Sequence, residues 1–173
     1  MVVDCAAAEA VSVDRATFVA TMGAVPTGVT IVTSLDSDGT PRGLTCNAFS
    51  SVSVDPPLLL VCVDKRSATL GALRASGRFA VNFLASGRDA VATLFATKAE
   101  DKFANIRWAP SRSGMPILID DAIAYAVCST VQEIESGDHY IFIGRVEEVQ
   151  PPRPDDEPLV YFRRKFGVVR HTS

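Results

Sequence analysis

Runs of apolar and β-branched residues, many of them alternating with polar ones, recur along this chain and indicate β-strands with a buried face. Seven stretches are predicted as strands: residues 28–34, 41–54, 58–63, 79–84, 122–134, 140–149 and 159–162. Short helices are predicted at residues 15–23 and 67–76, in the apolar run after residue 89, and as one turn at residues 101–106. Because most strands follow one another through turns, the order favours a mainly β fold, an antiparallel barrel with short peripheral helices.

Capping residues and turn residues mark the ends of these elements. Asp14 is expected to cap the first helix, and Ser67 the second helix, which Gly77 then closes. The residues Ser86–Asp89 match a capping box before the run AVATLFA. Residues 110–114 are expected to form a loop.

The second predicted strand, residues 41–54, either runs straight or is bent or bulged midway, and it has an unusual polar face within residues 44–54. If this segment is extended, one side is expected to face the core and carries Leu44, Cys46, Ala48, Ser50, Val52 and Val54. The other side carries Thr45, Asn47, Phe49, Ser51 and Ser53. Short hydroxyl and amide groups around one aromatic ring suit a flat, heteroatom-rich ligand, and an ordinary exposed sheet face is an equally good interpretation.

Length and composition indicate one globular domain. The 173 residues are 47% hydrophobic, with a net charge of -3 and a mean hydropathy of +0.19. We expect residues 1–13 to form a flexible arm and residues 14–170 a single domain. The charge predicts no nucleic-acid partner, and no apolar run approaches the roughly 20 residues that span a bilayer. Because the N-terminus lacks a secretory signal pattern, a cytoplasmic protein is expected.

Common catalytic motifs are missing from the sequence. No CxxC pair is formed by the four cysteines, Cys5, Cys46, Cys62 and Cys128. The last three lie in predicted strands, where we expect buried thiols. With His139 and His171 as the two histidines, no zinc or iron site is expected. The absence of GxGxxG, GxxxxGK[ST] and GxSxG motifs removes support for Rossmann, P-loop and serine-hydrolase chemistry.

Three further segments carry candidate binding chemistry. Residues 64–69 (DKRSAT) lie where a strand becomes a helix, and their bases and hydroxyls suit a phosphate or an ordinary helix cap. Residues 135–140 contain His139, either in a functional loop or as a structural histidine at a strand edge. Residues 159–167 interleave aromatic and basic side chains, which fits contact with a cofactor or anion as well as it fits a basic surface strand.

Taken together, these segments resemble the flavin reductase-like family, the small reductase components of two-component flavin-dependent monooxygenases. The matching pieces fall in the family's order between Phe18 and Gly167: GVTIVTS, GLTCNAFSSVSVDPPLLLVCV, GRFAVNFLA, FATKAEDKF, GDHYIFIGRVEEV and PLVYFRRKFG. Each piece alone is weak, and the specificity comes from the joint match over nearly the whole chain. The resemblance implies an antiparallel Greek-key, FMN-binding split barrel that forms a homodimer, with the flavin near the subunit interface.

The resemblance also implies an activity and a set of site residues. NADH or NADPH would reduce FMN or FAD, and the reduced flavin would pass transiently to a partner monooxygenase. The implied flavin contacts are Thr45, Cys46, Asn47, Ala48, Ser50, Ser51, Val63, Asp64, Lys65, Ser67, Asn82, Lys102 and Phe103. The implied NAD(P)H contacts are Gly137, Asp138, His139, Tyr161, Arg163 and Phe166, with His139 positioning the nicotinamide. The chain departs from relatives at Cys46, where alanine is frequent, and its RRKFG ending is a variable part of the family.

Hydride transfer between two stacked rings is consistent with a sequence that lacks catalytic acids, bases and metal ligands. Such a reaction needs the rings held in register at about 3–3.5 Å, while the cofactor carries the chemistry. Two alternatives remain open from the sequence. One is a split-barrel flavin oxidase of another substrate, and the other is a flavin-binding module without enzymatic activity.

Overall fold

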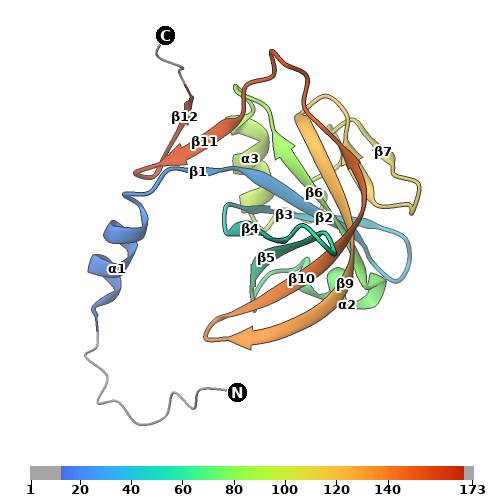
Figure 1. The fold of residues 1–173 in the computed structure, drawn as a ribbon, viewed down its shortest axis with the longest axis horizontal. Coiled ribbons are helices and arrows are strands. Elements are labelled where there is room, and N and C mark those ends of the chain that lie inside the picture. Colours follow the sequence, from blue (N-terminus) through green and yellow to red (C-terminus); the bar gives the residue numbers. More distant parts are fainter. Residues whose placement is uncertain (1–12, 170–173) are drawn as a thin grey trace.

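The computed structural model describes residues 13–169, and antiparallel strands are the main regular structure in this part of the chain (Figure 1). The expected arm falls almost entirely on residues 1–12, which lie outside the described residues, as do Cys5 and His171. The described residues contain three short helices: α1 (Arg15–Met22), α2 (Leu70–Ser76) and α3 (Asp89–Ala96). The strands are β1 (Thr27–Gly28), β2 (Thr30–Leu35), β3 (Pro41–Cys46), β4 (Phe49–Ser53), β5 (Leu58–Asp64), β6 (Arg78–Leu84), β7 (Trp108–Pro110), β8 (Pro116–Leu118), β9 (Ala122–Ser136), β10 (His139–Gln150), β11 (Leu159–Phe162) and β12 (Lys165–Val168).

Seven of these strands form one antiparallel sheet in the order β3-β2-β6-β9-β10-β5-β4. Its two edge strands, β3 and β4, are consecutive in sequence, so the sheet curls until its edges meet. The backbone N–H of Cys62 in β5 donates to the carbonyl of Ala48 at 2.9 Å, which extends the β4–β5 ladder into the β3–β4 connection. A mainly β, antiparallel barrel with short helices is therefore confirmed. Two smaller sheets, β1-β11-β12 and β7-β8, pack outside it.

Large side chains from opposite walls fill the barrel. Phe79 and Phe142 are fully buried there with aliphatic residues of β2, β5 and β6. Gly144 in β10 permits this packing, because a Cβ at that position would lie 2.6 Å from the ring of Phe79 and 2.6 Å from Cβ of Cys128. The thiols of Cys46 and Cys128 are buried, as expected, whereas Cys62 is only partly buried.

The prediction of one strand over residues 41–54 is wrong, because the segment forms two strands with different partners, interrupted midway where a bend or bulge was one of the expectations. β3 pairs with β2, and β4 pairs with β5. The break at 47–48 shifts the alternation, so Phe49 turns inward and packs edge-to-face on Phe83, with ring centroids 5.5 Å apart. Val52 and Val54, expected in the core, are 46% and 94% exposed.

The helix ends agree only in part with the predicted caps. The Asp14 carboxylate accepts hydrogen bonds from the N–H groups of Ala16 and Thr17, so the predicted N-cap of α1 is confirmed. The predicted start of α2 at Ser67 is wrong, since Ser67 Oγ accepts the Thr69 N–H in a separate turn and the helix begins at Leu70. α3 has no side-chain cap, so the predicted capping box does not form. Gly77 ends α2 with φ 61°, as expected.

Three short strands and one turn differ from the prediction. The expected loop at 110–114 is the turn of the β7–β8 hairpin, and β12 follows β11. The expected helical turn at 101–106 is irregular. β12 was not predicted because the turn before it lacks the usual turn residues. Arg163 and Arg164 form this turn with φ values of 48° and 64°, a region that glycine or asparagine usually occupies. Among residues 13–169, no helix is long and apolar enough to cross a membrane.

Candidate functional site

A cavity of about 520 Å³ opens between the end of β3 and the C-terminal end of α3. Three segments form it: the end of β3, the β5–α2 connection, and the segment that leaves α3. Its lining consists of Leu44, Thr45, Asp64, Arg66, Ser67, Ala68, Phe95, Ala96, Thr97, Lys98, Ala99 and Lys102. Four residues expected to contact flavin, Thr45, Asp64, Ser67 and Lys102, are therefore brought together from distant parts of the sequence.

The wall at β3 is fixed directly to α3. The Thr45 hydroxyl donates to the carbonyl oxygen of Ala92 at 2.5 Å, so this polar side chain joins the strand to the helix. Gly43, two residues earlier, lies against the ring of Phe95, whose own side chain is 1% exposed. The close approach of β3 and α3 sets the width of the cavity on this side.

The β5–α2 connection is held by its own side chains. The Asp64 carboxylate accepts the Arg66 N–H at 2.7 Å and pairs with the Arg66 guanidinium at 2.8 Å. The hydrogen bonds from Arg66 lower the pKa of Asp64 well below its ordinary range. Ser67 closes the following turn through its hydroxyl. The connection thus presents a paired Asp–Arg couple and a hydroxyl to the cavity, with the acidic charge of Asp64 already balanced.

Lys102 supplies positive charge to this cavity. Its ammonium donates to the carbonyl oxygens of Phe95 at 2.9 Å and of Gly43 at 3.1 Å. Within residues 13–169 it makes no ion pair with a carboxylate, and partial burial lowers its pKa below the ordinary value of 10.5. A partly desolvated ammonium that is held only by neutral carbonyls keeps its charge for an anionic group of a ligand.

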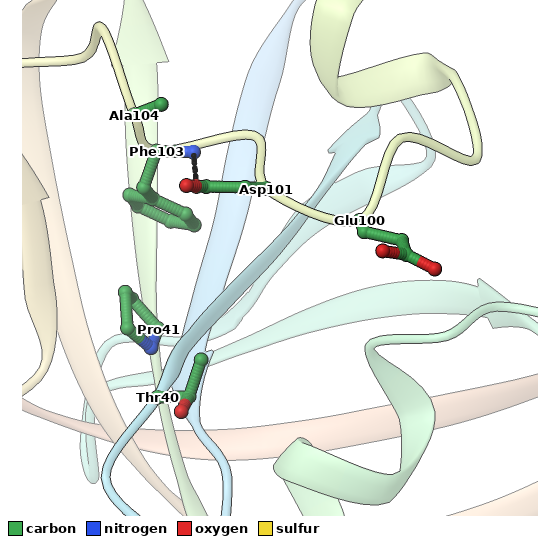
Figure 2. A pocket seen from close by; sticks show the side chains of 6 residues that line it. All are labelled: Thr40, Pro41, Glu100, Asp101, Phe103 and Ala104. Atoms are coloured by element: carbon green, nitrogen blue, oxygen red, sulfur yellow. Dashed lines mark hydrogen bonds between the residues drawn. The ribbon is translucent and has the colours of Figure 1, made fainter.

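A second cavity of about 460 Å³ lies further along the same groove (Figure 2). It is lined by Thr40, Pro41, Glu100, Asp101, Phe103 and Ala104. A small pocket of about 20 Å³, the neck, shares lining residues with both cavities, and Arg42, Gly43, Ala68 and Lys102 are among the residues that line it. Figure 2 shows the Asp101 carboxylate accepting the Phe103 N–H, at 3.0 Å. Phe103 is therefore near the groove, although its ring is 8% exposed and packs edge-to-face on Phe95 and Trp108.

Three expected flavin contacts are buried in the protein instead of lining the groove. Asn82 is fully buried, and its amide nitrogen donates to the Ile31 carbonyl and the Thr33 hydroxyl, both at 3.1 Å. Its amide oxygen accepts the Leu118 N–H at 2.9 Å, so the side chain joins β2 and β8 to β6 and is not available to a ligand. The side chains of Val63 and Cys46 point inward and belong to the barrel core.

The remaining expected flavin contacts lie on the surface beside the cavity but do not line it. Asn47, Ala48, Ser50 and Ser51 are exposed on the β3–β4 connection and on β4, and the Asn47 amide donates to the Thr27 hydroxyl at 3.1 Å. Lys65 points to the β9–β10 hairpin, where it pairs with Glu135. The polar face predicted over residues 44–54 is thus divided, with Thr45 in the cavity and the later residues on an edge strand.

The GDH segment, Gly137–His139, lies next to the β5–α2 connection. Gly137 takes φ 59° in the tight turn between β9 and β10. The Lys65 N–H donates to the Asp138 carbonyl at 3.0 Å, and His139 stands opposite Asp64 in the β5–β10 pair. Nδ1 of His139 lies 2.7 Å from the Asp138 carboxylate, and this contact lowers the pKa of Asp138. An imidazole with one nitrogen held in this way presents its other nitrogen outward.

The other expected NAD(P)H contacts are not brought to this segment within one chain. Tyr161, Arg163 and Phe166 belong to the β11–β12 hairpin, where the rings of Tyr161 and Phe166 lie 5.3 Å apart. Figure 1 shows this hairpin at one end of the molecule and the β9–β10 turn at the other. Within one chain these three residues therefore lie away from His139, because β11 pairs with β1 and β12.

Sequence reasoning missed most of the wall that follows α3. Phe95, Thr97, Lys98 and Ala99 line the main cavity, yet only the last part of the motif FATKAEDKF was selected. The polar residues after the apolar run AVATLFA were the available signal, since a helix end with a base and hydroxyl often faces a ligand or solvent. Among residues 13–169, no group of three or more His, Cys, Asp or Glu side chains gathers as a metal-binding cluster.

Comparison with known proteins gives consistent matches. The sequence model of a protein family, the flavin reductase like domain, matches residues 22–170 of this chain. A flavin reductase (NADH) from Kitasatospora aureofaciens is 47% identical over 157 residues, which are 90% of this chain and 82% of the relative. A flavin reductase (NADPH) from Lentzea aerocolonigenes is 47% identical over 151 residues, 86% of each protein. The structure of a Streptomyces globisporus NADH:FAD oxidoreductase with NAD and FAD fragments is 36% identical, with a TM-score of 0.82 over 92% of this chain and 93% of that chain.

Proposed function

Because the chain belongs to the flavin reductase-like family and is an NAD(P)H-dependent flavin reductase, we propose that it holds its flavin in the groove between β3, the β5–α2 connection and residues 95–103. The two alternatives left open by the sequence, an oxidase of another substrate and a non-enzymatic module, are set aside by the same relatives. Reduced flavin is supplied to a partner monooxygenase.

The observation that carries this assignment is the state of Lys102. Its ammonium borders the main cavity and, among residues 13–169, is bonded only to the carbonyls of Gly43 and Phe95. A phosphate is the charged part of FMN and FAD, and charge-assisted hydrogen bonds to it are about twice as strong as neutral ones. Ser67 and Arg66 on the opposite wall add a hydroxyl and a guanidinium. The charge and the donor types of the cavity therefore fit a flavin phosphate.

The cavity's shape and composition also fit the remainder of the molecule. A volume of about 520 Å³ is within the range of ligand pockets, and Leu44 and Ala96 supply apolar surface for a flat ring or a ribityl chain. When bound, the flavin accepts a hydride from NAD(P)H, and this chain's residues orient the two molecules without providing an acid, base or metal ligand.

The second cavity in Figure 2 supports the acceptance of FAD as well as FMN. Its connection to the main cavity passes Arg42 and Lys102, two cations suited to a pyrophosphate. Beyond this neck, Pro41 offers apolar surface, and Glu100 offers an acceptor for an exocyclic amine. We assign this cavity to the adenylate half of FAD, whereas FMN occupies the main cavity alone.

The nicotinamide side is assigned to the GDH segment. Asp138 fixes one ring nitrogen of His139, and the β5–β10 pairing holds His139 opposite Asp64, a residue of the cavity wall. His139 is therefore suited to position the carboxamide or a phosphate of NAD(P)H beside the flavin. Its role is positioning, because hydride transfer itself requires no proton from the imidazole.

A homodimer accounts for the exposed apolar surface at one end of the chain. α1 has no buried residue, and Phe18 and Met22 on it are 58% and 55% exposed. An isolated helix of this length is marginal in water unless its apolar side is packed. Phe162 and Phe166 of the β11–β12 hairpin are also exposed, and the Arg163 N–H donates to the Gly23 carbonyl, which joins this hairpin to α1. We assign this surface to contact with a second copy, whose β11–β12 hairpin would then reach a site that one chain cannot complete.

Initial rates of NADH and NADPH oxidation with FMN and with FAD test the assignment. The expected result is flavin-dependent oxidation of at least one nucleotide with both flavins, because both cavities are available. No flavin-dependent oxidation in any of the four combinations overturns the proposed function. Turnover with FMN but no measurable binding of FAD overturns the assignment of the second cavity alone.

A further inference from the structure

Gly43 is a glycine whose importance does not come from its backbone conformation. Its φ lies outside the left-handed region, so an alanine could adopt the same backbone angles. A Cβ at this position would lie 2.7 Å from Cε1 and 2.9 Å from Cδ1 of Phe95, closer than real Cβ contacts come. Glycine is therefore required here by the approach of α3 to β3.

The ring of Phe95 has no free space into which to move. It is 1% exposed and packs edge-to-face on Phe103, with ring centroids 5.1 Å apart and the planes at 89°. The same cluster includes the buried residues Ile31, Leu84 and Leu118. Because interiors are closely packed, a methyl group at residue 43 would separate β3 from α3 instead of simply rotating the ring.

The two residues that meet here also hold Lys102. The carbonyl oxygens of Gly43 and Phe95 lie 3.1 and 2.9 Å from its ammonium nitrogen. Any separation of β3 from α3 moves these two acceptors apart, and a single ammonium cannot then keep both bonds at good length. The position of the ammonium in the groove thus depends on the absence of a side chain at residue 43.

We propose that Gly43 is a positioning residue that sets the affinity of the site for the phosphate of its flavin, acting through Phe95 and Lys102. This inference rests on the proposed function, since it takes the ligand of Lys102 to be the flavin phosphate. Gly43 lines the neck but not the main cavity, so it touches no part of FMN in this account. It fixes the two carbonyls that aim the ammonium.

The test compares flavins with and without a phosphate. Dissociation constants of oxidised FMN and riboflavin are measured by flavin fluorescence, without NAD(P)H, for the full chain and for Gly43→Ala. The substitution is expected to weaken FMN by about tenfold and riboflavin by less than about twofold, because only FMN carries the group that Lys102 binds. Gly71→Ala is the matched control, since a Cβ at that glycine meets nothing within 4 Å.

A second variant separates positioning from loss of structure. Adding Phe95→Leu to Gly43→Ala removes the ring atoms that collide, and the FMN dissociation constant should return to within about threefold of the original value. Thermal unfolding of each variant shows whether the protein remains folded during the titration.

The outcomes distinguish this inference from the proposed function. Equal weakening of FMN and riboflavin, or no weakening of either, overturns the positioning role of Gly43. Wild-type protein that binds FMN and riboflavin equally while still oxidising NAD(P)H with FMN overturns the inference and leaves the reductase assignment intact. Wild-type protein that binds neither flavin and shows no flavin-dependent oxidation overturns both.

Discussion

His139 lies directly opposite Asp64 in the antiparallel pair of β10 and β5. Asp64 is part of the groove wall, and His139 follows the tight turn at Gly137. One strand pairing therefore sets the distance between the groove and the residue assigned to the nicotinamide. Because strand spacing is fixed by backbone hydrogen bonds, this relationship is insensitive to surface substitutions elsewhere.

Replacing His139 should affect the nicotinamide and not the flavin. His139→Ala is expected to raise the KM for NAD(P)H by about tenfold while the dissociation constant of oxidised FMN changes by less than about twofold. His139→Gln, which keeps a hydrogen-bond donor, should recover part of the loss. Steady-state kinetics and flavin titration check both values. A weaker FMN complex with unchanged KM for NAD(P)H would contradict the assignment.

Alkaline pH should weaken FMN binding through Lys102. Burial lowers the pKa of this ammonium below 10.5, so the folded chain loses its proton at a lower pH than the unfolded chain does. The Lys102 contribution to folding stability therefore rises with pH between the folded and the unfolded pKa, whereas affinity for a phosphate falls there. FMN titrations from about pH 7 to about pH 10 should show the fall.

Two controls identify the titrating group. Lys102→Arg keeps its charge throughout this range and should remove the fall in FMN affinity. Riboflavin shares the ionisation of the flavin ring but has no phosphate, so its affinity should change much less. An equal fall for both ligands in wild type and Lys102→Arg assigns the effect to the ring and rejects the role given to Lys102.

Asn82 should prove to be a residue of stability and not of binding. Asn82→Ala leaves the buried Leu118 N–H without its acceptor and removes the donors to Ile31 and Thr33, for a loss of about 2–4 kcal/mol in the free energy of unfolding. Urea unfolding measures this loss. Asn105→Ala, at an exposed position, should cost less than about 0.5 kcal/mol. A folded Asn82→Ala protein with weakened FMN binding would restore the original prediction of a flavin contact.

The apolar surface of α1 should hold two copies together. Phe18→Glu places a charge where Phe18 is 58% exposed in the single chain and is expected to give monomers. Ala20→Glu, about 200° around the helix from Phe18, should leave the dimer intact. Light scattering coupled to size-exclusion chromatography reports the mass. A wild-type monomer, or a Phe18→Glu dimer, contradicts this interface.

Local signals in the sequence predicted the elements whose partners lie nearby in the chain. The β9–β10 hairpin follows from two long alternating runs joined through Gly137, and the N-cap of α1 follows from Asp14. The division of residues 41–54 could not be predicted in this way. Both halves alternate equally well, and only the closure of the barrel assigns β3 to β2 and β4 to β5.

Site residues were predicted where a sequence motif lines the groove. They were missed where the groove wall is formed by contact between segments that are distant in the sequence. Thr45, Asp64, Ser67 and Lys102 were predicted and meet in one cavity. Asn82 was assigned to flavin through the resemblance of the FAVNFL strand to the family, but buried neighbours satisfy its amide instead. The wall after α3 depends on contacts between residues far apart in the sequence, such as Lys102 with Gly43, 59 positions earlier, which no local pattern encodes.

The most direct test of the groove as the flavin site is a charge placed inside it. Ala68 is an exposed residue that lines both the main cavity and the neck, whereas Ala75 is exposed on α2 outside them. FMN fluorescence titration of Ala68→Glu should give a dissociation constant at least about tenfold above wild type, because the carboxylate occupies the groove and repels the phosphate, while Ala75→Glu should match wild type. Wild-type affinity in Ala68→Glu, or equal loss in both variants, would contradict a flavin bound in this groove.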